Sequence, residues 1–600
     1  MISGQKPLIL ASLLALTLPA ALASPRQRSD ELTKVFRSWF KDYKAGKIEV
    51  GDEQGTLSKP YISAALRTQL PQWFGRPTRV NEARQIFSLM RKRATEEDGQ
   101  NLVDVVLVGA KKRGGLLIGG TYYTFRQAVL PYLRGPETPP NIKKAVVERM
   151  ESGLVVPRPD ASNPVWRHKD PTTARLLAPL VGSYKNQLYR GTLEALLKVD
   201  DPDLQIAAAK GLGRMGSGNS MEKVSETLAN LKYHDQFVEV ADALILLAKA
   251  TQPKAPEEQL VHTLRAVLDV IQQQKNWRTR SALLPVLATM RGKASVPVLI
   301  GLLEEANANP KEKGKSGAYA SSGTLLVDIA ETLKDLTGFY APTNQPERWR
   351  SWWEKQEDGF KIKPATGTRP DRTAKAKDGK EGKTSASSFF GIPVTGSRVV
   401  FILDVSGSML WYMGRRMPRG PVQLPTGDYE SRIKRAKQEL LSAINGMTSD
   451  DKFNVVFFST KARVWKKKLV VANKSNKKSI ADTVARIHAD GNTALYDAVR
   501  DGLEIKAKRK PGSRYASDVD EVFLLSDGAP TAGEILDMQQ ILDKIRSFNR
   551  GARIRINTIY LGTKEPAPVT AQGVPIQSLS TDQFMKRLAE QNRGKFRMVK

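Results

Sequence analysis

The stretch VVFILDVSGSML, residues 399–410, decides the fold of the C-terminal third of the chain. Its first half is an apolar run, which is typical of a parallel strand that is covered on both faces. The run ends at Asp404, and Ser406 and Ser408 follow at every second position. Because alternate side chains of an extended segment point to the same side, these three oxygen-bearing groups are expected to face one point. Gly407 lets the backbone bend tightly between them.

Strands and helices alternate from residue 397 to the end of the chain. The predicted strands are 397–404, 452–460, 521–527, 553–562 and 594–600, with an antiparallel edge strand at 462–472. The predicted helices are 432–447, 477–490, 493–508, 534–548 and 581–591. This alternation predicts a doubly wound, mostly parallel α/β sheet. Ligands of such sheets bind beyond the carboxyl ends of the strands.

Two more oxygen-bearing residues belong with the first three. Asp527 ends a predicted central strand, and Thr493, preceded by Gly491, stands at the start of a predicted helix. Asp404 and Asp527 therefore both lie at the carboxyl edge of the sheet. Since every candidate ligand atom is an oxygen, the set suits Mg²⁺, Mn²⁺ or Ca²⁺ rather than Zn²⁺.

Residues 390–600 resemble a von Willebrand factor type A domain. Three patterns carry the resemblance: D-x-S-x-S from Asp404, G-x-T-x-x-x-x-A from Gly491 and S-D-G at 526–528. Together they include all five positions of that family's metal-ion-dependent adhesion site. The resemblance implies a Rossmann-like fold in which Ser406 and Ser408 bind the ion directly. It implies that Asp404, Asp527 and Thr493 reach the ion directly or through water. It further implies that Mg²⁺ is the expected ion and that a carboxylate of a partner protein completes its coordination.

Other interpretations of the motif fit less well. A calcium-binding EF-hand loop needs Gly at its sixth position and Glu at its twelfth, where this chain has Met409 and Arg415. An aspartyl phosphotransfer site would carry a second acid at position 406, and a hydrolase elbow needs G-x-S-x-G. The remaining alternative is a strand-to-loop turn whose hydroxyls cap a helix.

The connection after this motif is long. It places aromatic and basic residues near the predicted ion: Trp411, Tyr412, Arg415, Arg416 and Arg419. Long loops on rigid scaffolds often carry function, so this segment is expected to shape partner choice or to cover the site. An ordinary surface insertion fits equally well.

The segment 171–358 is predicted to be an α-helical solenoid of HEAT-like repeats. Stretches rich in Ala and Leu recur at 204–216, 240–250, 280–292 and 325–338, and such units stack on their neighbours because they cannot bury their faces alone. A mostly helical region, 24–170, precedes it, although 103–110 and 114–123 fit either helix or strand. A basic linker at 359–389 separates it from the α/β domain.

Two motifs in the helical segment have competing explanations. Residues 211–216 fit the dinucleotide pattern G-x-G-x-x-G, but a helix rather than a strand precedes them. These glycines are expected to end a helix and to allow close helix packing. Trp349, Trp352 and Trp353 share one helical face. They are expected to close the end of the solenoid core, with an aromatic ligand platform as the alternative.

Composition and the N-terminus bear on location. Residues 1–23 have the charged, apolar and A-x-A parts of a secretory signal peptide, with an uncleaved membrane anchor as the alternative. The chain is therefore expected to be exported to a periplasm, a cell envelope or the extracellular space. Its net charge of +32 suits an anionic envelope surface, and an exported chain seldom meets nucleic acid. The absence of Cys excludes disulfides and thiolate chemistry.

The expected function is metal-dependent protein binding or cell adhesion through an exposed Asp or Glu of the partner. No enzyme activity is expected, because none of the four His lies in a metal or triad motif and the serines lack an evident base. One alternative is a basic protein that binds polyanions or the envelope. Another is a non-catalytic partner of an ATPase complex.

Overall fold

The computed structural model describes residues 100, 103, 133–156, 166–251, 257–274, 276–308, 323–362, 387–413, 429–505, 517–563 and 579–599. The predicted signal peptide, the ambiguous stretch at 104–123 and most of the predicted linker lie outside these residues. The chain divides into two compact units, with the boundary between Thr227 and Leu228. The domain boundaries predicted from the sequence stay predictions. Within the described residues, no helix is long and apolar enough to cross a membrane.

The first unit is built from helices and one short hairpin. The α-helices in its described residues are α7 (Pro140–Glu151), α8 (Pro171–Ser183), α9 (Arg190–Leu197), α10 (Pro202–Met215) and α11 (Met221–Glu226). Strands β1 (Leu154–Val155) and β2 (Arg167–His168) pair antiparallel.

The glycines of the G-x-G-x-x-G pattern serve helix packing. Gly211 lies inside α10, and a Cβ on Gly182 of α8 would stand 2.0 Å from the carbonyl oxygen of Gly211. The two helices therefore approach closely because both positions lack a side chain. Gly216 ends α10 in the left-handed conformation, with φ of 76°. The prediction that these glycines pack and terminate a helix is confirmed.

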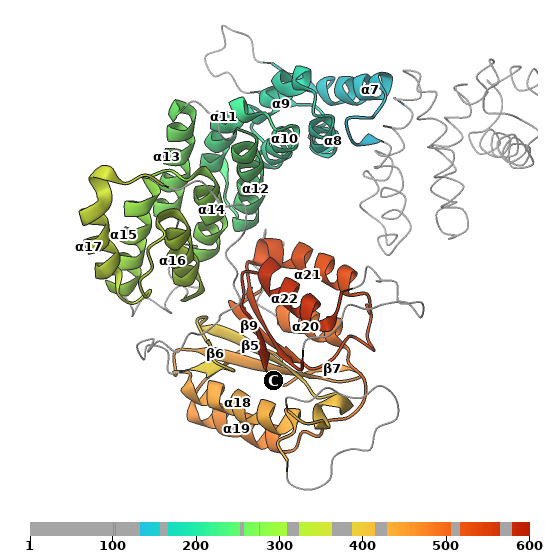
Figure 1. Cartoon of the computed structure of the whole chain (residues 1–600). Helices are drawn as coiled ribbons and strands as arrows, with labels where there is room; N and C mark the ends of the chain where they lie inside the picture. Colours follow the sequence, from blue (N-terminus) through green and yellow to red (C-terminus); the bar gives the residue numbers. More distant parts are fainter. Residues whose placement is uncertain are drawn as a thin grey trace, which may run out of the picture. The chain divides into compact units, whose positions relative to one another are not determined.

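The second unit begins with six more helices, coloured green to yellow-green in Figure 1. They are α12 (His234–Thr251), α13 (Glu257–Gln273), α14 (Trp277–Met290), α15 (Ser295–Ala308), α16 (Gly323–Thr337) and α17 (Pro346–Gln356). The four Ala- and Leu-rich stretches correspond to α10, α12, α14 and α16, so their helical nature is confirmed. Their assignment to HEAT-like repeats stays a prediction.

The tryptophans of α17 are part of a packed aromatic cluster. Trp349 and Trp353 are buried, and Trp352 stacks on Phe339 with ring centroids 4.8 Å apart. Phe360 contacts both Trp352 and Trp353 edge-on. These contacts support the packing interpretation over an exposed ligand platform.

An α/β domain completes the second unit. Its strands are β5 (Arg398–Asp404), β6 (Lys452–Phe458), β7 (Ala462–Val464), β8 (Val470–Val471), β9 (Glu521–Ser526), β10 (Arg555–Leu561) and β11 (Phe596–Val599). The sheet order is β11-β10-β9-β5-β6-β7, and β8 also pairs with β6. Among the described strands of this sheet, only β7 and β8 run antiparallel to their neighbour. The predicted doubly wound, mostly parallel fold is confirmed. A separate hairpin joins β3 (Ser388–Phe389) and β4 (Ile392–Pro393).

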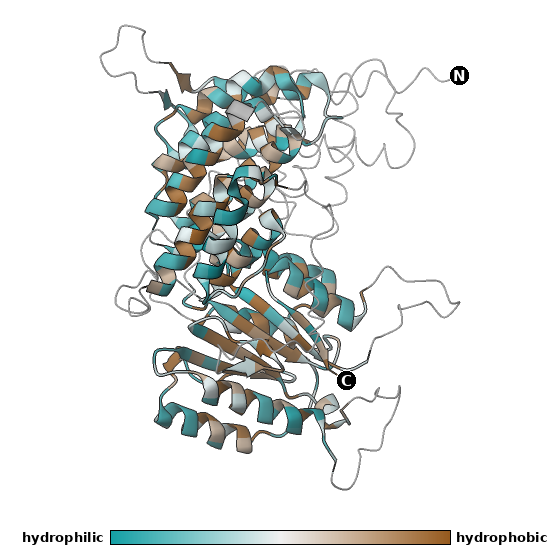
Figure 2. Ribbon diagram, turned by 60° about the vertical axis from the view of Figure 1, so that its left-hand side comes forward, coloured by the Kyte–Doolittle hydropathy of each residue, from teal (hydrophilic) through white to brown (hydrophobic). Residues whose placement is uncertain are grey.

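Helices cover both faces of this sheet (Figure 1). They are α18 (Arg432–Gly446) and α19 (Lys474–Ala485) on one face, and α20 (Leu495–Leu503), α21 (Met538–Ala552) and α22 (Thr581–Gln591) on the other. Alternate residues of β5 enter opposite cores: Phe401 packs toward α18 and Ile402 toward α20. Figure 2 shows hydrophobic residues concentrated along the strands, which explains why the apolar runs are continuous rather than alternating.

Two predicted elements differ from the structure. Helix α21 begins at Met538, four residues later than predicted, because Asp537 caps it by accepting the backbone N–H of Gln540. The predicted edge strand at 462–472 is interrupted between β7 and β8. There the buried Asn454 of β6 donates to the carbonyls of Lys466 and Lys468 and holds a turn in place of strand pairing.

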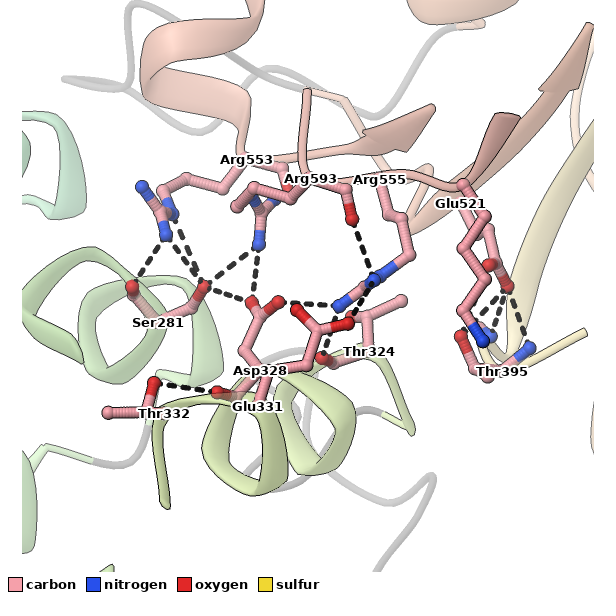
Figure 3. A network of polar contacts seen from close by, with 12 residues as sticks. Ser281, Thr324, Asp328, Glu331, Thr332, Thr395, Glu521, Arg553, Arg555 and Arg593 are labelled. Atoms are coloured by element: carbon pink, nitrogen blue, oxygen red, sulfur yellow. Dashed lines mark hydrogen bonds and ion pairs between the residues drawn. The ribbon is translucent and has the colours of Figure 1, made fainter. Parts of the chain in front are cut away.

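A buried charged network joins the helices of the second unit to the α/β domain (Figure 3). At its centre is Asp328 of α16, which accepts hydrogen bonds from Arg555 at 2.5 Å and from Arg593 at 2.5 Å. Ser281 of α14 donates to the same carboxylate at 2.7 Å, and Arg553 donates to Ser281. Asp328 is 8% exposed, so the ion pairs are shielded from water. We refer to Asp328, Arg553, Arg555 and Arg593 as the arginine cluster.

Further contacts extend this junction. Arg278 of α14 donates to the backbone carbonyl of Ala552 at 2.8 Å and to that of Val519 at 2.9 Å. Arg550 of α21 pairs with Asp242 of α12 at 2.6 Å. The contacting residues of the domain precede β9, β10 and β11 or begin β10. The helices therefore hold the sheet at the amino ends of β9, β10 and β11.

Candidate functional site

The candidate site begins where β5 ends. Asp404 is the last residue of this strand and is completely buried. One of its carboxylate oxygens accepts the backbone N–H of Ser406 at 2.8 Å, and the other accepts the hydroxyl of Ser526 at 2.6 Å. Ser526 is the last residue of β9, so Asp404 is held between the carboxyl ends of the two central strands.

The two predicted serine ligands lie beside this carboxylate. The hydroxyl oxygens of Ser406 and Ser408 are 3.1 Å apart, and Ser408 donates to Asp527 at 2.7 Å. Ser406 is buried, whereas Ser408 is partly exposed. The structure thus brings Asp404, Ser406, Ser408 and Asp527 into one cluster, as the alternating pattern predicts.

Thr493 lies on a neighbouring loop. The N–H of Gly407 donates to the carbonyl of Gly491 at 3.0 Å, which ties this loop to the serine loop. The backbone N–H of Thr493 donates to the hydroxyl of Thr531 at 2.9 Å. Among the described residues, the Thr493 hydroxyl forms no hydrogen bond with the other four predicted ligands. Helix α20 starts at Leu495, so Thr493 precedes it by two residues.

Arg432 is a component of the site that the sequence analysis missed. It is the first residue of α18, and its guanidinium donates to Asp527 at 2.7 Å. Both side chains are buried, with 4% and 0% exposure. A signal was present in the sequence, because Arg432, Ala436 and Leu440 are four residues apart on the buried face of α18. A charge on an apolar helix face indicates a buried partner.

The pKa values of Asp404 and Asp527 show that the site disfavours two ionised carboxylates in the absence of a bound ion. Burial, and after it the neighbouring Asp527 carboxylate, raise the pKa of Asp404 to about 7. Burial also raises the pKa of Asp527, and Arg432 acts against that rise. A bound cation would favour the ionised form of both groups.

The donor set fits a hard divalent cation. Four side chains present oxygen atoms, and two of them are hydroxyls that carry no charge. No group of three or more His, Cys, Asp and Glu suited to a metal occurs in the part of the chain that the structure describes. With both carboxylates ionised, Asp404, Asp527 and Arg432 carry a net charge of −1. A divalent ion would change this to +1, which attracts an anionic ligand.

The long connection after Ser408 is described only at its two ends. Trp411 and Tyr412 are partly buried, and Tyr412 lies 4.8 Å from Tyr429, measured between ring centroids. The N–H of Trp411 donates to the carbonyl of Ser408 at 3.0 Å. These contacts place both aromatic residues next to the serine loop. Arg415, Arg416 and Arg419 lie outside the described residues.

Comparison with known families places the domain in a class. Residues 426–597 match the family model described as von Willebrand factor type A domain. The chain therefore carries such a domain at its C-terminal end, in agreement with the doubly wound sheet and with the resemblance of its motifs. The matched range begins after Ser408, so the first three predicted ligands precede it.

Individual relatives match part of this chain. Inter-alpha-trypsin inhibitor heavy chain H1 of Mesocricetus auratus is 31% identical over 155 residues, which cover 26% of this chain and 15% of that protein. Heavy chain H3 of Mus musculus is 30% identical over 182 residues, or 29% of this chain and 18% of that protein. The similarity thus spans less than a fifth of the length of either relative.

Solved structures also match part of this chain. An aerotolerance-related membrane protein from Bacteroides fragilis is 17% identical, and the match covers 34% of this chain and 92% of that one, with a TM-score of 0.23. A von Willebrand factor type A protein from Catenulispora acidiphila is 18% identical over 34% of this chain and 39% of that one, also with a TM-score of 0.23.

Proposed function

We propose that this chain is an exported, non-enzymatic protein-binding scaffold whose type A domain holds an acidic partner through a divalent cation. The observation that carries the proposal is the hydrogen-bonded cluster of Asp404, Ser406, Ser408 and Asp527 at the carboxyl ends of β5 and β9. Oxygen ligands with little negative charge leave a bound ion able to accept a carboxylate.

Each residue has a distinct role in this proposal. Ser406 and Ser408 present their hydroxyl oxygens to the ion, and Asp404 orients the serine loop by accepting the N–H of Ser406. Asp527 balances the charge of the ion, and Arg432 holds the second carboxylate oxygen of Asp527 by a hydrogen bond. Thr493 is proposed as a fifth ligand, directly or through water, because the hydrogen bond from Gly407 to Gly491 ties its loop to the serine loop. The ion, when bound, supplies a coordination position for a carboxylate of the partner.

Two further features support an exported binding role. The relatives that match part of this chain are named as heavy chains of an inhibitor, which supports a binding role over an enzymatic one. The first 23 residues have the pattern of a secretory signal. Mg²⁺ is the proposed ion, with Mn²⁺ or Ca²⁺ as alternatives that the same oxygen ligands would accept.

The first experiment measures binding of Mg²⁺ and Mn²⁺ to the full chain by calorimetry. We expect Asp404→Asn and Ser408→Ala to weaken metal binding at least about tenfold, the lower end of the loss expected when a ligand's environment is disrupted. Ser475→Ala on α19 is the matched control, because it removes a serine hydroxyl far from the cluster. Equal affinity in all four proteins would show that the cluster is not a metal site.

A second experiment concerns the partner. The full chain is used to capture proteins from envelope extract in Mg²⁺, in chelator, and as Ser408→Ala in Mg²⁺. We expect a partner that only the unaltered chain with metal retains. Partners that are held equally in all three conditions and released by salt would contradict metal-dependent binding and favour simple charge attraction.

A further inference from the structure

A ridge of exposed cations lines one edge of the sheet. It consists of Lys461, Arg463, Lys466, Lys467, Lys468 and Lys474, all of which are exposed. These residues belong to the segment that runs from the end of β6 through β7 and β8 to the start of α19. We call them the basic ridge. It begins near the candidate site, because the Thr460 hydroxyl accepts the N–H of Asn492 beside Thr493.

The chain segment that forms the basic ridge carries no acidic residues of its own. Residues 452–481 contain nine Lys and Arg and no Asp or Glu. None of the six ridge residues forms an ion pair within the part of the chain that the structure describes. The positive charge of the ridge is therefore available to an external anion, and the overall charge of +32 does not by itself explain its concentration at one edge.

The centre of the ridge is held rigidly. The buried amide of Asn454 donates to the carbonyls of Lys466 and Lys468 at 2.6 and 3.1 Å, and accepts the N–H of Lys466 at 3.2 Å. Trp465 stacks on Phe453 with centroids 5.5 Å apart. Three consecutive lysines are thus presented outward from an ordered turn, so little backbone entropy is lost when they contact a ligand.

Protection of the sheet edge explains only part of this arrangement. Lysines on an edge strand discourage pairing with another sheet. That role requires charge on the strands themselves, yet Lys466, Lys467 and Lys468 occupy the turn between β7 and β8. Lys474 is the first residue of α19. The ridge therefore extends beyond the strands that need protection.

The chemistry of the ridge favours a lipid headgroup surface. Five of its six residues are lysines, whose compact charges suit diffuse attraction to phosphates, whereas bidentate recognition favours arginine. Single-stranded nucleic acid needs exposed aromatic side chains for stacking, and Trp465 is partly buried beneath Lys466. A protein interface normally centres on apolar or aromatic anchors, and the ridge offers none.

We propose that the basic ridge binds anionic phospholipid headgroups and so places this chain on a membrane surface. The interaction is electrostatic and independent of the proposed metal site. It requires no apolar insertion, and its strength falls as salt screens the lysines. The type A domain would then be held at the envelope by one edge.

The test is sedimentation of the full chain with vesicles of equimolar phosphatidylglycerol and phosphatidylcholine. The triple variant Lys466→Gln, Lys467→Gln, Lys468→Gln is expected to bind these vesicles about 100-fold more weakly, since each lysine contributes about a factor of five. The control variant Lys544→Gln, Arg546→Gln, Arg587→Gln removes the same charge from α21 and α22. It is expected to bind as the unaltered chain does.

Three outcomes would overturn the proposal. Equal losses in both triple variants would show that overall charge, not the ridge, attracts the lipid. Loss of duplex DNA binding by the ridge variant, with vesicle binding retained, would make the ridge a nucleic-acid surface. Vesicle binding that disappears in chelator or in Asp404→Asn would belong to the metal site. Failure of the metal proposal alone leaves vesicle binding by the ridge unchanged, so the two proposals can be distinguished.

Discussion

Replacement of Asp328 by Asn tests whether the arginine cluster stabilises the second unit. The carboxylate accepts from Arg555 and Arg593 at 2.5 Å and from Ser281 at 2.7 Å, and it is almost fully buried. Asparagine has the same shape but cannot neutralise the arginines. The variant therefore removes the charged partner that the buried Arg593 and Arg555 share, while Arg555 retains its ion pair with Glu331 at 3.7 Å.

Two physical arguments give the loss in the free energy of unfolding that Asp328→Asn should cause. Removing one member of a buried ion pair typically costs about 3–5 kcal/mol. Burial alone would raise the pKa of Asp328, but Arg593, Arg555 and Arg553 outweigh it and lower that pKa from 3.8 to about 2. A shift of that size corresponds to about 2.5 kcal/mol of stability at neutral pH. We therefore expect Asp328→Asn to lower the free energy of unfolding by about 3 kcal/mol.

The pH dependence has a definite sign. Because the folded state lowers the pKa of Asp328, the carboxylate stabilises the fold above its ordinary pKa of 3.8. That contribution is lost as the pH falls from about 4 toward 2. The difference in stability between the unaltered chain and Asp328→Asn should therefore be full at pH 7 and shrink across this acidic window.

The assay is urea unfolding of the full chain, followed by tryptophan fluorescence, because urea adds no ions that screen the cluster. Asp335→Asn is the matched control, since it lies on the same helix and pairs with Arg291 while exposed to solvent. Its expected cost is about 0–1 kcal/mol. Equal unfolding midpoints for the two variants would refute the reasoning, and so would a difference between Asp328→Asn and the unaltered chain that persists at pH 2.

Further predictions concern three other positions. Burial raises the pKa of Asp520 to about 6, so the free energy of unfolding should fall as the pH rises from about 4 to 6. Above that range Asp520→Asn should be more stable than the unaltered chain by about 1–3 kcal/mol in urea titrations. A variant that is less stable than the unaltered chain at pH 7 would contradict this. Gly182→Ala would bring a methyl group against the Gly211 carbonyl. Thermal unfolding should then show that the free energy of unfolding falls by about 1–3 kcal/mol. An unchanged transition would mean that α8 and α10 can move apart at little cost. Asn454→Ala leaves the carbonyls of the lysine turn unpaired, so hydrogen exchange at residues 465–469 should accelerate relative to β6; unchanged exchange would show that the turn holds itself.

Much of the α/β domain could be predicted from the sequence because its signals are local. A continuous apolar run that ends in Asp404 indicates a covered parallel strand and also locates its carboxyl end. The alternation of Asp404, Ser406 and Ser408 predicts that their side chains converge, and the structure shows the hydrogen-bonded cluster. Asp527 could be added because a second strand ends beside it.

Other features depend on partners that are distant in the sequence. The pairing of Arg432 with Asp527 spans 95 residues, and that of Arg555 with Asp328 spans 227. No local pattern specifies such a partner, although a charge on the buried face of α18 indicates that a buried partner exists. The break in the predicted edge strand has a similar origin, because it depends on the amide of Asn454 in the neighbouring strand.

The opposite placement of the arginine cluster and the candidate site has a mechanical consequence. The helices hold the amino ends of the strands, while Asp404 and Asp527 lie at the carboxyl ends, about 20 Å away across a seven-residue strand. A pull on a partner attached at that end would run lengthwise along β9 toward the helices that contact the chain just before this strand. Such a force would load the hydrogen bonds between the parallel strands in shear, all at once, instead of breaking them one after another. The domain is therefore anchored in the orientation that resists tension better.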